Sequence, residues 1–337
     1  MSVLKSHLSK IIAGDALSNA EMRDAMEILL RGDASDAEIG AFLVGMRTKG
    51  ETIDEIAAAA ETMRTMSVKV DAPANALDTC GTGGDGANTY NISTAVALVV
   101  AGCGVPVAKH GNKAATSQSG SSDVLSALGV KMAIEPEQVC RCIEGANVGF
   151  MFAALHHSAV ANVAPARKAV GVRTMFNILG PLCNPARAKR QLMGVFDKTL
   201  LKPVASVMDR LGIQRAWVVH GSDGLDEITT TGPSFVASLD RGKIAEFTVA
   251  PSDAGISEAS LEDLKGGSPT ENAAAIEELL AGDRDAYRDI VLLNSAAALI
   301  VADKVNNLRD GVEMAAHAID RGAAKASLDR LIEISNA

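Results

Sequence analysis

Four glycines lie within the six residues from Gly81 to Gly86, and an apolar run over residues 95–101 follows them. This order predicts a loop that leads into a buried helix. Glycines let backbone N–H groups approach a ligand closely, and the unpaired N–H groups of a helix's first turn attract an anion. Ser93 and Thr94 stand at the predicted helix start, where a hydroxyl caps the helix or binds a phosphate or its metal. Residues 78–94 therefore predict a phosphate-binding loop.

Two other interpretations of this stretch must be weighed. The pattern Gly81-x-Gly83-x-x-Gly86 matches the dinucleotide-binding expression, but that fold places an acidic residue about 20 positions on to bind the ribose hydroxyls. No Asp or Glu occurs between Asp85 and Asp123, and Asp85 would put a carboxylate inside the pyrophosphate turn. The dinucleotide interpretation is therefore disfavoured. A glycine-rich turn that binds no ligand stays open as an alternative.

A second polar stretch reads K-H-G-N-K-A-A-T-S-Q-S-G-S-S-D over residues 109–123, directly after a predicted strand at 105–108. Ligands of open parallel sheets bind outside the carboxyl ends of the strands, so this stretch predicts a second phosphate-binding loop. Lys109 supplies a positive charge and Gly111 permits a close approach. Donors to phosphate oxygens are available from Asn112, Thr116, Ser117, Ser119 and Ser121. A solvated polar loop is the alternative.

Three charged side chains elsewhere in the chain are suited to bind a metal or an anion. Asp226 and Glu227 end the motif G-S-D-G-L-D-E, just beyond a predicted strand at 216–220. Because Mg²⁺ is commonly held by one or two carboxylates together with phosphate, this pair predicts a magnesium site; an exposed acidic turn is the alternative. Arg167 presents a planar guanidinium that can bind a carboxylate with two hydrogen bonds. A surface arginine without a ligand is the alternative for Arg167.

Composition and charge narrow the class of protein. The chain has 337 residues, of which 47% are hydrophobic and only 3% aromatic. Such a length suits two domains or one large one, and an aliphatic core suits helices packed on a parallel sheet. The formal net charge of −9 argues against nonspecific binding to nucleic acid.

The cysteines and the apolar runs indicate the compartment. Five cysteines, an odd number without C-x-x-C spacing, favour reduced thiols. Lys5, His7 and Lys10 interrupt the first apolar residues, so no signal peptide is expected. No uninterrupted apolar run approaches the roughly 18 residues that span a bilayer. We therefore expect a cytoplasmic protein with no membrane partner.

The chain divides into a helical region and an α/β region. Capping boxes at Ser18-x-x-Glu21, Ser35-x-x-Glu38 and Thr52-x-x-Glu55 mark helix starts in the first seventy residues. From residue 76 onward, strand candidates at 76–79, 105–108, 148–152, 193–196 and 216–220 alternate with helical patterns at 122–128, 135–144 and 200–211. Such alternation predicts a mostly parallel sheet. A hairpin at 234–239 and 244–249 follows, and helices at 270–280, 286–303 and 308–321 close the chain.

The predicted fold class is therefore α/β, with a small mainly helical N-terminal domain and a larger domain built on a central, mostly parallel sheet flanked by helices. The helical domain is expected over residues 1–72, and the larger domain over residues 73–337. The segment 164–185 breaks the alternation of strands and helices and is expected to return to the helical domain. A partner subunit is a candidate for covering the apolar stripes of the N-terminal helices.

Taken together, these motifs resemble the anthranilate phosphoribosyltransferase family of tryptophan biosynthesis, over essentially the whole chain. The resemblance is carried by G-T-G-G-D at 81–85, N-I-S-T at 91–94, K-H-G-N-K at 109–113, S-G-S-S-D at 119–123, F-N-I-L-G-P-L-C-N-P at 176–185 and G-S-D-G-L-D-E at 221–227. Lys113 and Gln118 depart from the arginine and lysine that many members carry there. Pyrimidine nucleoside phosphorylases share the fold and a G-T-G-G loop, but their lysine- and serine-bearing motif differs from K-H-G-N.

The resemblance implies transfer of a 5-phosphoribosyl group from phosphoribosyl pyrophosphate to the amino group of anthranilate, in a homodimer formed through the N-terminal helices. Magnesium would be held with Ser93, Asp226 and Glu227. No strong general base is expected, because the aromatic amine is already neutral near pH 7. Nucleoside phosphorolysis on the same fold and a non-catalytic nucleic-acid-binding relative are the competing hypotheses.

The resemblance also implies the residues that bind each substrate. For phosphoribosyl pyrophosphate they are Gly81, Gly84, Asp85, Thr89, Asn91, Ile92, Ser93, Thr94, Lys109, His110, Gly111, Asn112, Lys113, Ala114, Ala115, Thr116, Ser117 and Ser121. For anthranilate they are Gly81, Asn112 and Arg167, with His110, His157, Gly180 and Pro181 lining its approach.

Overall fold

The computed structural model describes residues 2–113 and 118–337. Residues 5–66 fold into the helices α1 (Lys5–Ile12), α2 (Asn19–Arg31), α3 (Asp36–Lys49) and α4 (Ile53–Met66). All three predicted capping boxes are confirmed: Ser18, Ser35 and Thr52 each accept a hydrogen bond from the backbone N–H three residues on, and the glutamate there binds back. Each box satisfies N–H groups that a helix start leaves without partners.

In the described part of the chain, seven strands form one sheet in the order β3-β2-β1-β4-β5-β6-β7. The strands are β1 (Leu77–Asp78), β2 (Val107–Gly111), β3 (Val148–Phe152), β4 (Arg190–Gly194), β5 (Arg215–Gly221), β6 (Ser234–Asp240) and β7 (Lys243–Val249). Neighbours from β3 to β5 run parallel, whereas β6 and β7 are antiparallel. The predicted mostly parallel sheet and its C-terminal hairpin are confirmed.

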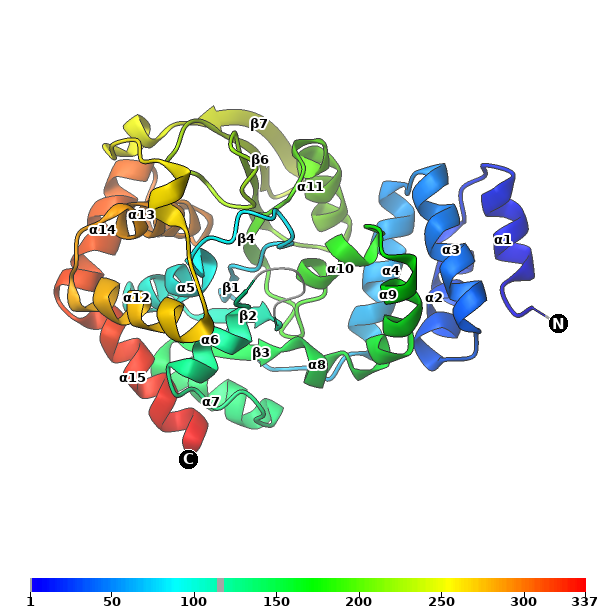
Figure 1. Ribbon diagram of the computed structural model, residues 1–337, viewed down its shortest axis with the longest axis horizontal. Coiled ribbons are helices and arrows are strands. Elements are labelled where there is room, and N and C mark those ends of the chain that lie inside the picture. Colours follow the sequence, from blue (N-terminus) through cyan, green and yellow to red (C-terminus); the bar gives the residue numbers. More distant parts are fainter. Residues whose placement is uncertain (1, 114–117) are drawn as a thin grey trace.

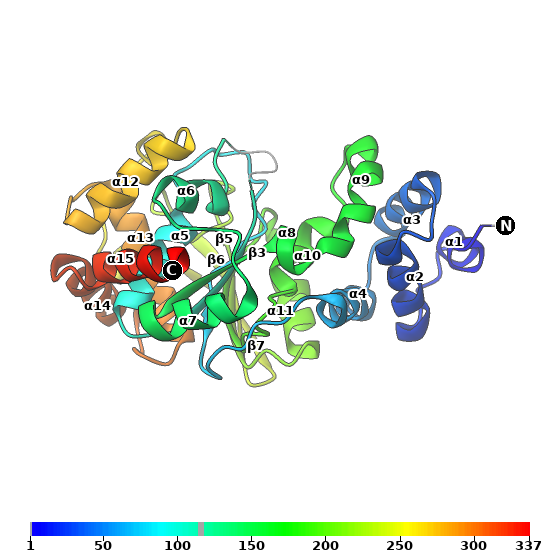
Figure 2. The same cartoon turned by 90° about the horizontal axis from the view of Figure 1, so that it is seen from below.

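Helices cover both faces of this sheet. Figure 2 shows α5 (Ile92–Gly102), α13 (Ala286–Val301), α14 (Leu308–Asp320) and α15 (Ala323–Asn336) on one side, and α10 (Phe176–Leu182) and α11 (Leu201–Arg210) on the side of the N-terminal helices. Successive residues of a strand serve opposite faces. On β4, Leu192 belongs to the core under α5 and α13, and Met193 belongs to the core under α11.

The remaining helices lie around these two layers (Figure 1). They are α6 (Ser121–Ala127), α7 (Pro136–Ala146), α8 (Ala153–His156), α9 (Ala164–Val170) and α12 (Pro269–Ala281), with short 3₁₀ turns at η1 (Ser158–Asn162), η2 (Lys198–Leu200), η3 (Pro251–Ala254) and η4 (Leu261–Leu264). None of the helices in residues 2–113 and 118–337 is long and apolar enough to cross a bilayer.

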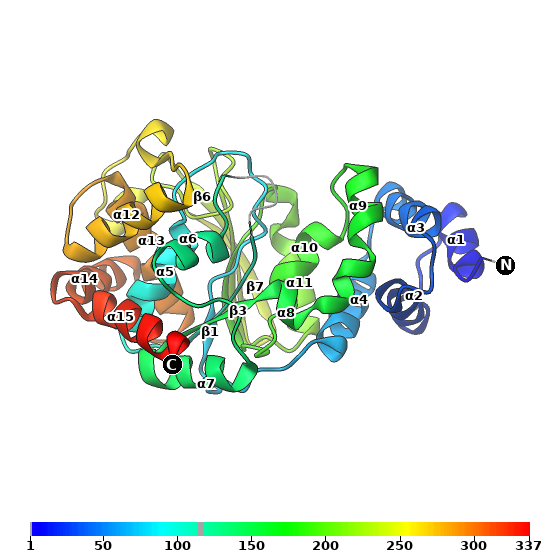
Figure 3. The same cartoon turned by 60° about the horizontal axis from the view of Figure 1, so that its bottom comes forward.

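The segment between β3 and β4 joins the sheet to the N-terminal helices. Its helix α9 packs beside α3, and α10 contacts α4 (Figure 3). The Asn162 side-chain amide donates to the Leu30 carbonyl at 2.8 Å. Buried Arg64 of α4 donates through Nε to the Leu182 carbonyl at 2.7 Å. One hydrophobic cluster therefore runs from the N-terminal helices through α10 and α11 to the sheet.

The structure corrects two local expectations. Strand β2 extends to Gly111, because its residues pair with β3 as far as Gly111 with Phe152. Lys109 and His110 are therefore strand residues rather than loop residues. Helix α15 was absent from the predicted elements, since Gly322 precedes it and makes no side-chain cap that would mark its start. Its buried Leu328 and Leu331 complete the core against α5.

Candidate active site

Three loops meet at the carboxyl edge of the parallel strands, where open α/β sheets bind their ligands. The glycine loop, residues 79–91, joins β1 to α5. Of the second loop, the structure describes residues 112–113 after β2 and 118–120 before α6, and the acidic loop, residues 222–233, joins β5 to β6. Hydrogen bonds connect the glycine loop to the acidic loop at Gly83 and Asp226, and to the second loop at Asn91 and Ser119.

The acidic loop packs directly against the glycine loop. The Gly83 N–H donates to Asp226 Oδ2 at 2.6 Å. A Cβ on Gly194, the last residue of β4, would stand 1.5 Å from the Asp226 carbonyl oxygen, and a Cβ on Gly81 would stand 2.7 Å from Asp226 Oδ2. Both glycines therefore permit the approach of Asp226. Gly194 was missed by sequence reasoning, since nothing near it in the chain points to residue 226.

Three further hydrogen bonds fix the glycine loop at Thr82 and Gly84. The Thr82 N–H donates to the Gly194 carbonyl at 2.9 Å, and the Phe196 N–H donates to Thr82 Oγ1 at 3.1 Å. Arg173, from the segment between α9 and α10, donates to the Gly84 carbonyl. Its guanidinium also lies 4.1 Å from the centre of the Phe196 ring. The segment that returns to the helical region thus touches the glycine loop.

The acidic pair lies in a crowded environment, and both residues are half-buried. Burial, together with the charge of Asp85, raises the pKa of Asp226 to about 7. Burial and the neighbouring Asp226 raise the pKa of Glu227 well above its ordinary value, while Lys109 and the Ser93 backbone N–H act in the opposite direction. Carboxyl groups held this close favour a bound cation, because a cation removes the repulsion that raises their pKa.

The oxygen donors present fit a magnesium ion. Asp226 and Glu227 offer two carboxylates, and the contact between Glu227 and the Ser93 backbone N–H places Ser93 beside them. Among the described residues, no three His, Cys, Asp or Glu side chains form a group that could hold a metal by themselves. Two carboxylates are enough for Mg²⁺, which is commonly bound by one or two of them while phosphate and water fill its other coordination positions.

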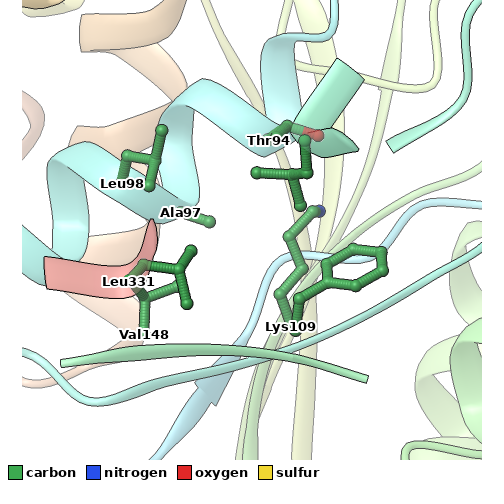
Figure 4. A pocket seen from close by; sticks show the side chains of 8 residues that line it. Thr94, Ala97, Leu98, Lys109, Val148 and Leu331 are labelled. Atoms are coloured by element: carbon green, nitrogen blue, oxygen red, sulfur yellow. The ribbon is translucent and has the colours of Figure 1, made fainter. Parts of the chain in front are cut away.

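Lys109 lies beneath the glycine loop rather than in the second loop. Its ammonium is buried and donates to the Thr79 carbonyl at 2.9 Å, to Thr79 Oγ1 at 3.3 Å and to Ser93 Oγ at 3.3 Å. Figure 4 shows its stem beside a small cavity and its nitrogen directed toward Thr94. Lys109 therefore places a positive charge under the start of α5, where it faces the acidic pair.

The start of α5 differs in detail from the prediction. Asn91, not Ser93 or Thr94, occupies the N-cap position. The side chains of Ile92 and Thr94 are buried, and Thr94 Oγ1 has no hydrogen-bond partner among the described residues. The Ile92 N–H donates to the Tyr90 carbonyl at 2.8 Å. Of these two residues, Thr94 can therefore face an anion, and only through its backbone N–H.

Asn91 links the glycine loop to two other segments. Its Nδ2 donates to the Ser119 carbonyl at 3.1 Å, and its Oδ1 accepts from Asn272 Nδ2 at 2.9 Å. Thr89 forms an isolated antiparallel bridge with Lys265. Lys265, before α12, and Asn272, in its first turn, therefore contact the glycine loop at Thr89 and Asn91. Sequence reasoning missed Asn272 because it lies 181 positions from Asn91.

In the second loop the described residues converge on Gly111. A Cβ on Gly111 would stand 2.3 Å from Ser121 Oγ, which itself donates to the Asn112 carbonyl at 3.3 Å. The Lys113 N–H donates to Asn112 Oδ1 at 2.9 Å, and the Lys113 side chain is exposed. The predicted phosphate residues Ala114, Ala115, Thr116 and Ser117 lie outside the described residues.

A second group of predicted residues forms a buried, uncharged cluster, the neutral wall. His110 Nδ1 lies 3.1 Å from the Gly180 carbonyl, and His157 Nε2 lies 2.9 Å from the Cys183 carbonyl. The two rings are 5.2 Å apart. Burial lowers the pKa of His157 to about 4 and that of His110 well below its ordinary value. Both rings are therefore neutral at pH 7, and each donates its N–H to a carbonyl.

Arg167 lies on α9, beside the first residue of α10, the helix that carries Gly180. Its guanidinium, on α9, is 5.1 Å from the centre of the Phe176 ring at the start of α10, and burial lowers its pKa. Phe176 and Gly180 are four residues apart and so share one side of α10. Pro181 is buried, and its carbonyl accepts from Gln191 Nε2 at 2.8 Å. Helix α10 thus connects the arginine to the two histidines.

Asp78, at the end of β1, joins the neutral wall to the sheet. It accepts from the His110 N–H at 3.1 Å and from Asn184 Nδ2 at 2.7 Å, and Asn184 Nδ2 also donates to the Ala108 carbonyl. Burial raises the pKa of Asp78 to about 6, against these hydrogen bonds. Sequence reasoning missed both Asp78 and Asn184, which act only through contacts between distant segments.

Comparison with protein families agrees with this architecture. The a/b domain of a glycosyl transferase family matches residues 73–325, and the helical bundle domain of that family matches residues 5–67. The fold is therefore that of glycosyl transferases that combine a helical bundle with an α/β domain.

Individual relatives are similar over the full length. The chain is 56% identical to the anthranilate phosphoribosyltransferase of Parvibaculum lavamentivorans, covering 100% of this chain and 98% of the relative. The crystal structure of the Thermus thermophilus enzyme matches with a TM-score of 0.93 and 41% identity, covering 98% and 99% of the two chains. The Saccharomyces cerevisiae enzyme in complex with phosphoribosyl pyrophosphate and Mg matches with a TM-score of 0.91 and 30% identity, covering 99% and 98%. The chain belongs to the anthranilate phosphoribosyltransferase family.

The buried state of His157 predicts a pH dependence of stability. The unfolded chain binds a proton there near pH 6.5, whereas the folded chain binds it only near pH 4. This contribution to stability is therefore complete above pH 6.5 and is lost as the pH falls toward 4. Between pH 7.5 and 5.0 it amounts to roughly 1–2 kcal/mol.

The measurement is urea unfolding at pH 7.5 and pH 5.0 of the unsubstituted protein and of His157→Gln, which keeps an N–H donor. The unsubstituted protein should lose more stability on acidification than the variant. Because Asp78 has a raised pKa, its contribution changes with pH in the opposite direction, but it is common to both proteins and cancels in the difference. Equal losses in the two proteins would contradict the prediction.

Proposed function

We propose that this chain transfers the 5-phosphoribosyl group of phosphoribosyl pyrophosphate to the amine of anthranilate, giving N-(5-phosphoribosyl)anthranilate and pyrophosphate. This reaction is the second step of tryptophan synthesis from chorismate. The observation that carries the proposal is the hydrogen bond between Asp226 and the glycine loop, beside the first turn of α5. The neutral wall and Arg167, which packs on Phe176, make up the other half of the proposed site. The full-length similarity to anthranilate phosphoribosyltransferases supports it.

Phosphoribosyl pyrophosphate carries a monophosphate at one end of its sugar and a diphosphate at the other, so it needs two anion sites. Between Gly81 and Thr94, the glycine loop and the start of α5 offer backbone N–H groups other than those, such as Thr82 and Gly83, that already donate within the protein. The second loop offers residues 109–117 and Ser121. As the C1–O bond breaks, negative charge collects on the departing pyrophosphate, and fixed N–H dipoles stabilise it without having to reorganise.

Magnesium is assigned to Ser93, Asp226 and Glu227. The bound ion would supply positive charge at the diphosphate, where the leaving group forms. The protein holds this site in shape, since Gly83 and Gly194 fix Asp226 and the Ser93 N–H contacts Glu227. Lys109 offsets part of the negative charge from below.

Anthranilate is assigned to the space between Gly81, Asn112 and Arg167, with His110, His157, Gly180 and Pro181 along its approach. Arg167 would bind its carboxylate, and Arg173 keeps the neighbouring segment against the glycine loop. The two histidines are neutral. No strong general base is required, because an aromatic amine is already unprotonated near pH 7; its orientation against C1 supplies much of the rate.

The domain bounds, the oligomeric state and the cellular compartment are assigned from features outside the site. We assign residues 1–72 with the segment 164–185 to a helical domain, and residues 73–337 to the domain that binds phosphoribosyl pyrophosphate. Apolar side chains stay exposed on or beside the helical domain's helices, with Ile12 84% exposed. A homodimer through these helices would cover some of these apolar side chains.

All five cysteines are free thiols, as a cytoplasmic location requires. The net charge of −9 argues against a nucleic-acid partner.

The direct test of the function follows the fluorescence of anthranilate. Fluorescence should fall only when the protein, phosphoribosyl pyrophosphate and Mg²⁺ are all present, because the transfer consumes the free arylamine. Omitting each component in turn provides the controls. Release of a free base from a pyrimidine nucleoside and inorganic phosphate, with no change in anthranilate, would instead favour nucleoside phosphorolysis.

The role of Arg167 predicts a selective loss of acceptor binding. Arg167→Ala removes the partner of the anthranilate carboxylate, so the KM for anthranilate should rise about tenfold or more, as loss of a charge-assisted hydrogen bond would require. The KM for phosphoribosyl pyrophosphate should change little. Lys168→Ala, at the exposed next position of α9, is the matched control and should leave both constants unchanged. A larger effect on phosphoribosyl pyrophosphate would remove Arg167 from the acceptor site.

The proposed dimer predicts a molecular mass in solution near twice that of the 34.8 kDa chain. Light scattering at micromolar concentration measures it. Ile12→Glu would place a charge among the exposed apolar side chains of the N-terminal helices and should shift the mass toward that of the monomer. A monomer mass for the unsubstituted protein would reject the dimer.

A further inference from the structure

A buried asparagine holds the backbone next to the acidic pair. The Ile228 N–H donates to Asn294 Oδ1 at 2.9 Å, and Asn294 Nδ2 donates back to the Ile228 carbonyl at 2.8 Å. Asn294 lies on α13, 66 positions further along the chain, and is 0% exposed. Its second Nδ2 hydrogen goes to the Ile290 carbonyl, one turn earlier on the helix, at 2.9 Å.

This arrangement uses the hydrogen-bonding capacity of the amide in a specific way. A side-chain amide carries both a donor and an acceptor, so it binds the N–H and the carbonyl of one residue as a neighbouring strand would. Ile228 is also 0% exposed, so water cannot replace these bonds. Removing the amide would leave two buried backbone groups without partners, which is costly. The peptide that directly follows Glu227 is therefore fixed in place.

The rest of the acidic loop is fixed from within. Asp223 Oδ2 accepts from the hydroxyls of Thr229 and Thr231 at 2.6 and 2.7 Å, and Asp223 Oδ1 accepts from the Leu225 N–H at 3.2 Å. These bonds join the beginning of the loop to its end, and they do not connect the loop to α13. Asn294 supplies the link to α13, and Gly83 supplies the link at Asp226. The two carboxylates lie between these attachments.

We propose that Asn294 is a positioning residue for the reaction. By fixing Ile228 it holds Asp226 and Glu227 toward Ser93, so that their carboxylates form a cation site before any substrate arrives. Partners that orient metal ligands in this way typically contribute tenfold to a hundredfold in metal affinity. The inference rests on the proposed metal role of Asp226 and Glu227, and Asn294 itself would touch neither metal nor substrate.

The test compares substitutions at two adjacent buried positions of α13. Asn294→Ala removes both bonds to Ile228. Asn294→Ser also removes them but can still donate to the Ile290 carbonyl within the helix, so it keeps a folded variant available if alanine unfolds the protein. Ser295→Ala is the matched control, because Ser295 is equally buried and its hydroxyl has no hydrogen-bond partner among the described residues.

The main readout is Mn²⁺ binding without turnover. Enhancement of water-proton relaxation is titrated with Mn²⁺ at saturating phosphoribosyl pyrophosphate and without anthranilate. Both Asn294 variants should need about tenfold more Mn²⁺ for half-maximal enhancement, and Ser295→Ala should match the unsubstituted protein. In the metal-free proteins, backbone amides of residues 224–230 should exchange with deuterium faster in the Asn294 variants alone. Unchanged Mn²⁺ binding and exchange in the folded Asn294 variants would overturn the proposal.

A double variant, Asp226→Asn with Glu227→Gln, separates this inference from the function on which it rests. If it binds Mn²⁺ as tightly as the unsubstituted protein, the metal assignment fails. If it loses Mn²⁺ while the Asn294 variants retain normal affinity, the metal assignment stands and the positioning role of Asn294 fails. Loss in both sets, with normal binding in Ser295→Ala, supports the two together.

Discussion

The close approach of the Asp226 backbone to Gly194 is the contact on which the site depends. A single added carbon at residue 194 would stand 1.5 Å from the Asp226 carbonyl oxygen. This approach lets Asp226 reach the Gly83 N–H and brings Glu227 to the first turn of α5, above Lys109. Crowding carboxyl groups away from water is unfavourable by itself. The fold can hold them there because the surrounding contacts, from β4, α5 and α13, fix the backbone on either side.

The site divides into a charged half and a neutral half, and this division suits the two substrates. Around the acidic loop, raised carboxyl pKa values indicate a place that favours added positive charge. Around His110 and His157, burial keeps both rings uncharged, and each ring donates to a carbonyl rather than to a carboxylate. Under the proposed assignment, the uncharged amine of the acceptor would lie against this wall without removing water from a fixed charge, and Arg167 would pair with the acceptor carboxylate. The polyanionic donor would instead lie against backbone N–H groups and a cation.

Local patterns predicted a large part of this structure from the sequence. The capping boxes, the mostly parallel order of the strands and the hairpin depend on neighbouring residues and were predicted from them, although β2 and β4 differ from their predicted bounds of 105–108 and 193–196. The glycine loop and the acidic pair were found because residue types within one short segment suffice to show their chemistry. Gly194, Asn272 and Asn294 were missed because their importance lies in partners far along the chain. Lys109 was placed in a loop because its pairing with Phe150 of β3 was not visible in its own segment.

The N-terminal helices share one hydrophobic core with the segment to which the acceptor is assigned. Helices α9 and α10 carry Arg167 and Gly180, and their inner faces join the same hydrophobic cluster as α2, α3 and α4. Buried Arg64 ties α4 to the end of α10. On its other side, the same segment reaches the glycine loop through Arg173. Packed interiors transmit displacements because they have little free volume. A shift of the N-terminal helices, including one imposed by a second subunit, would therefore move Arg167 relative to the glycine loop.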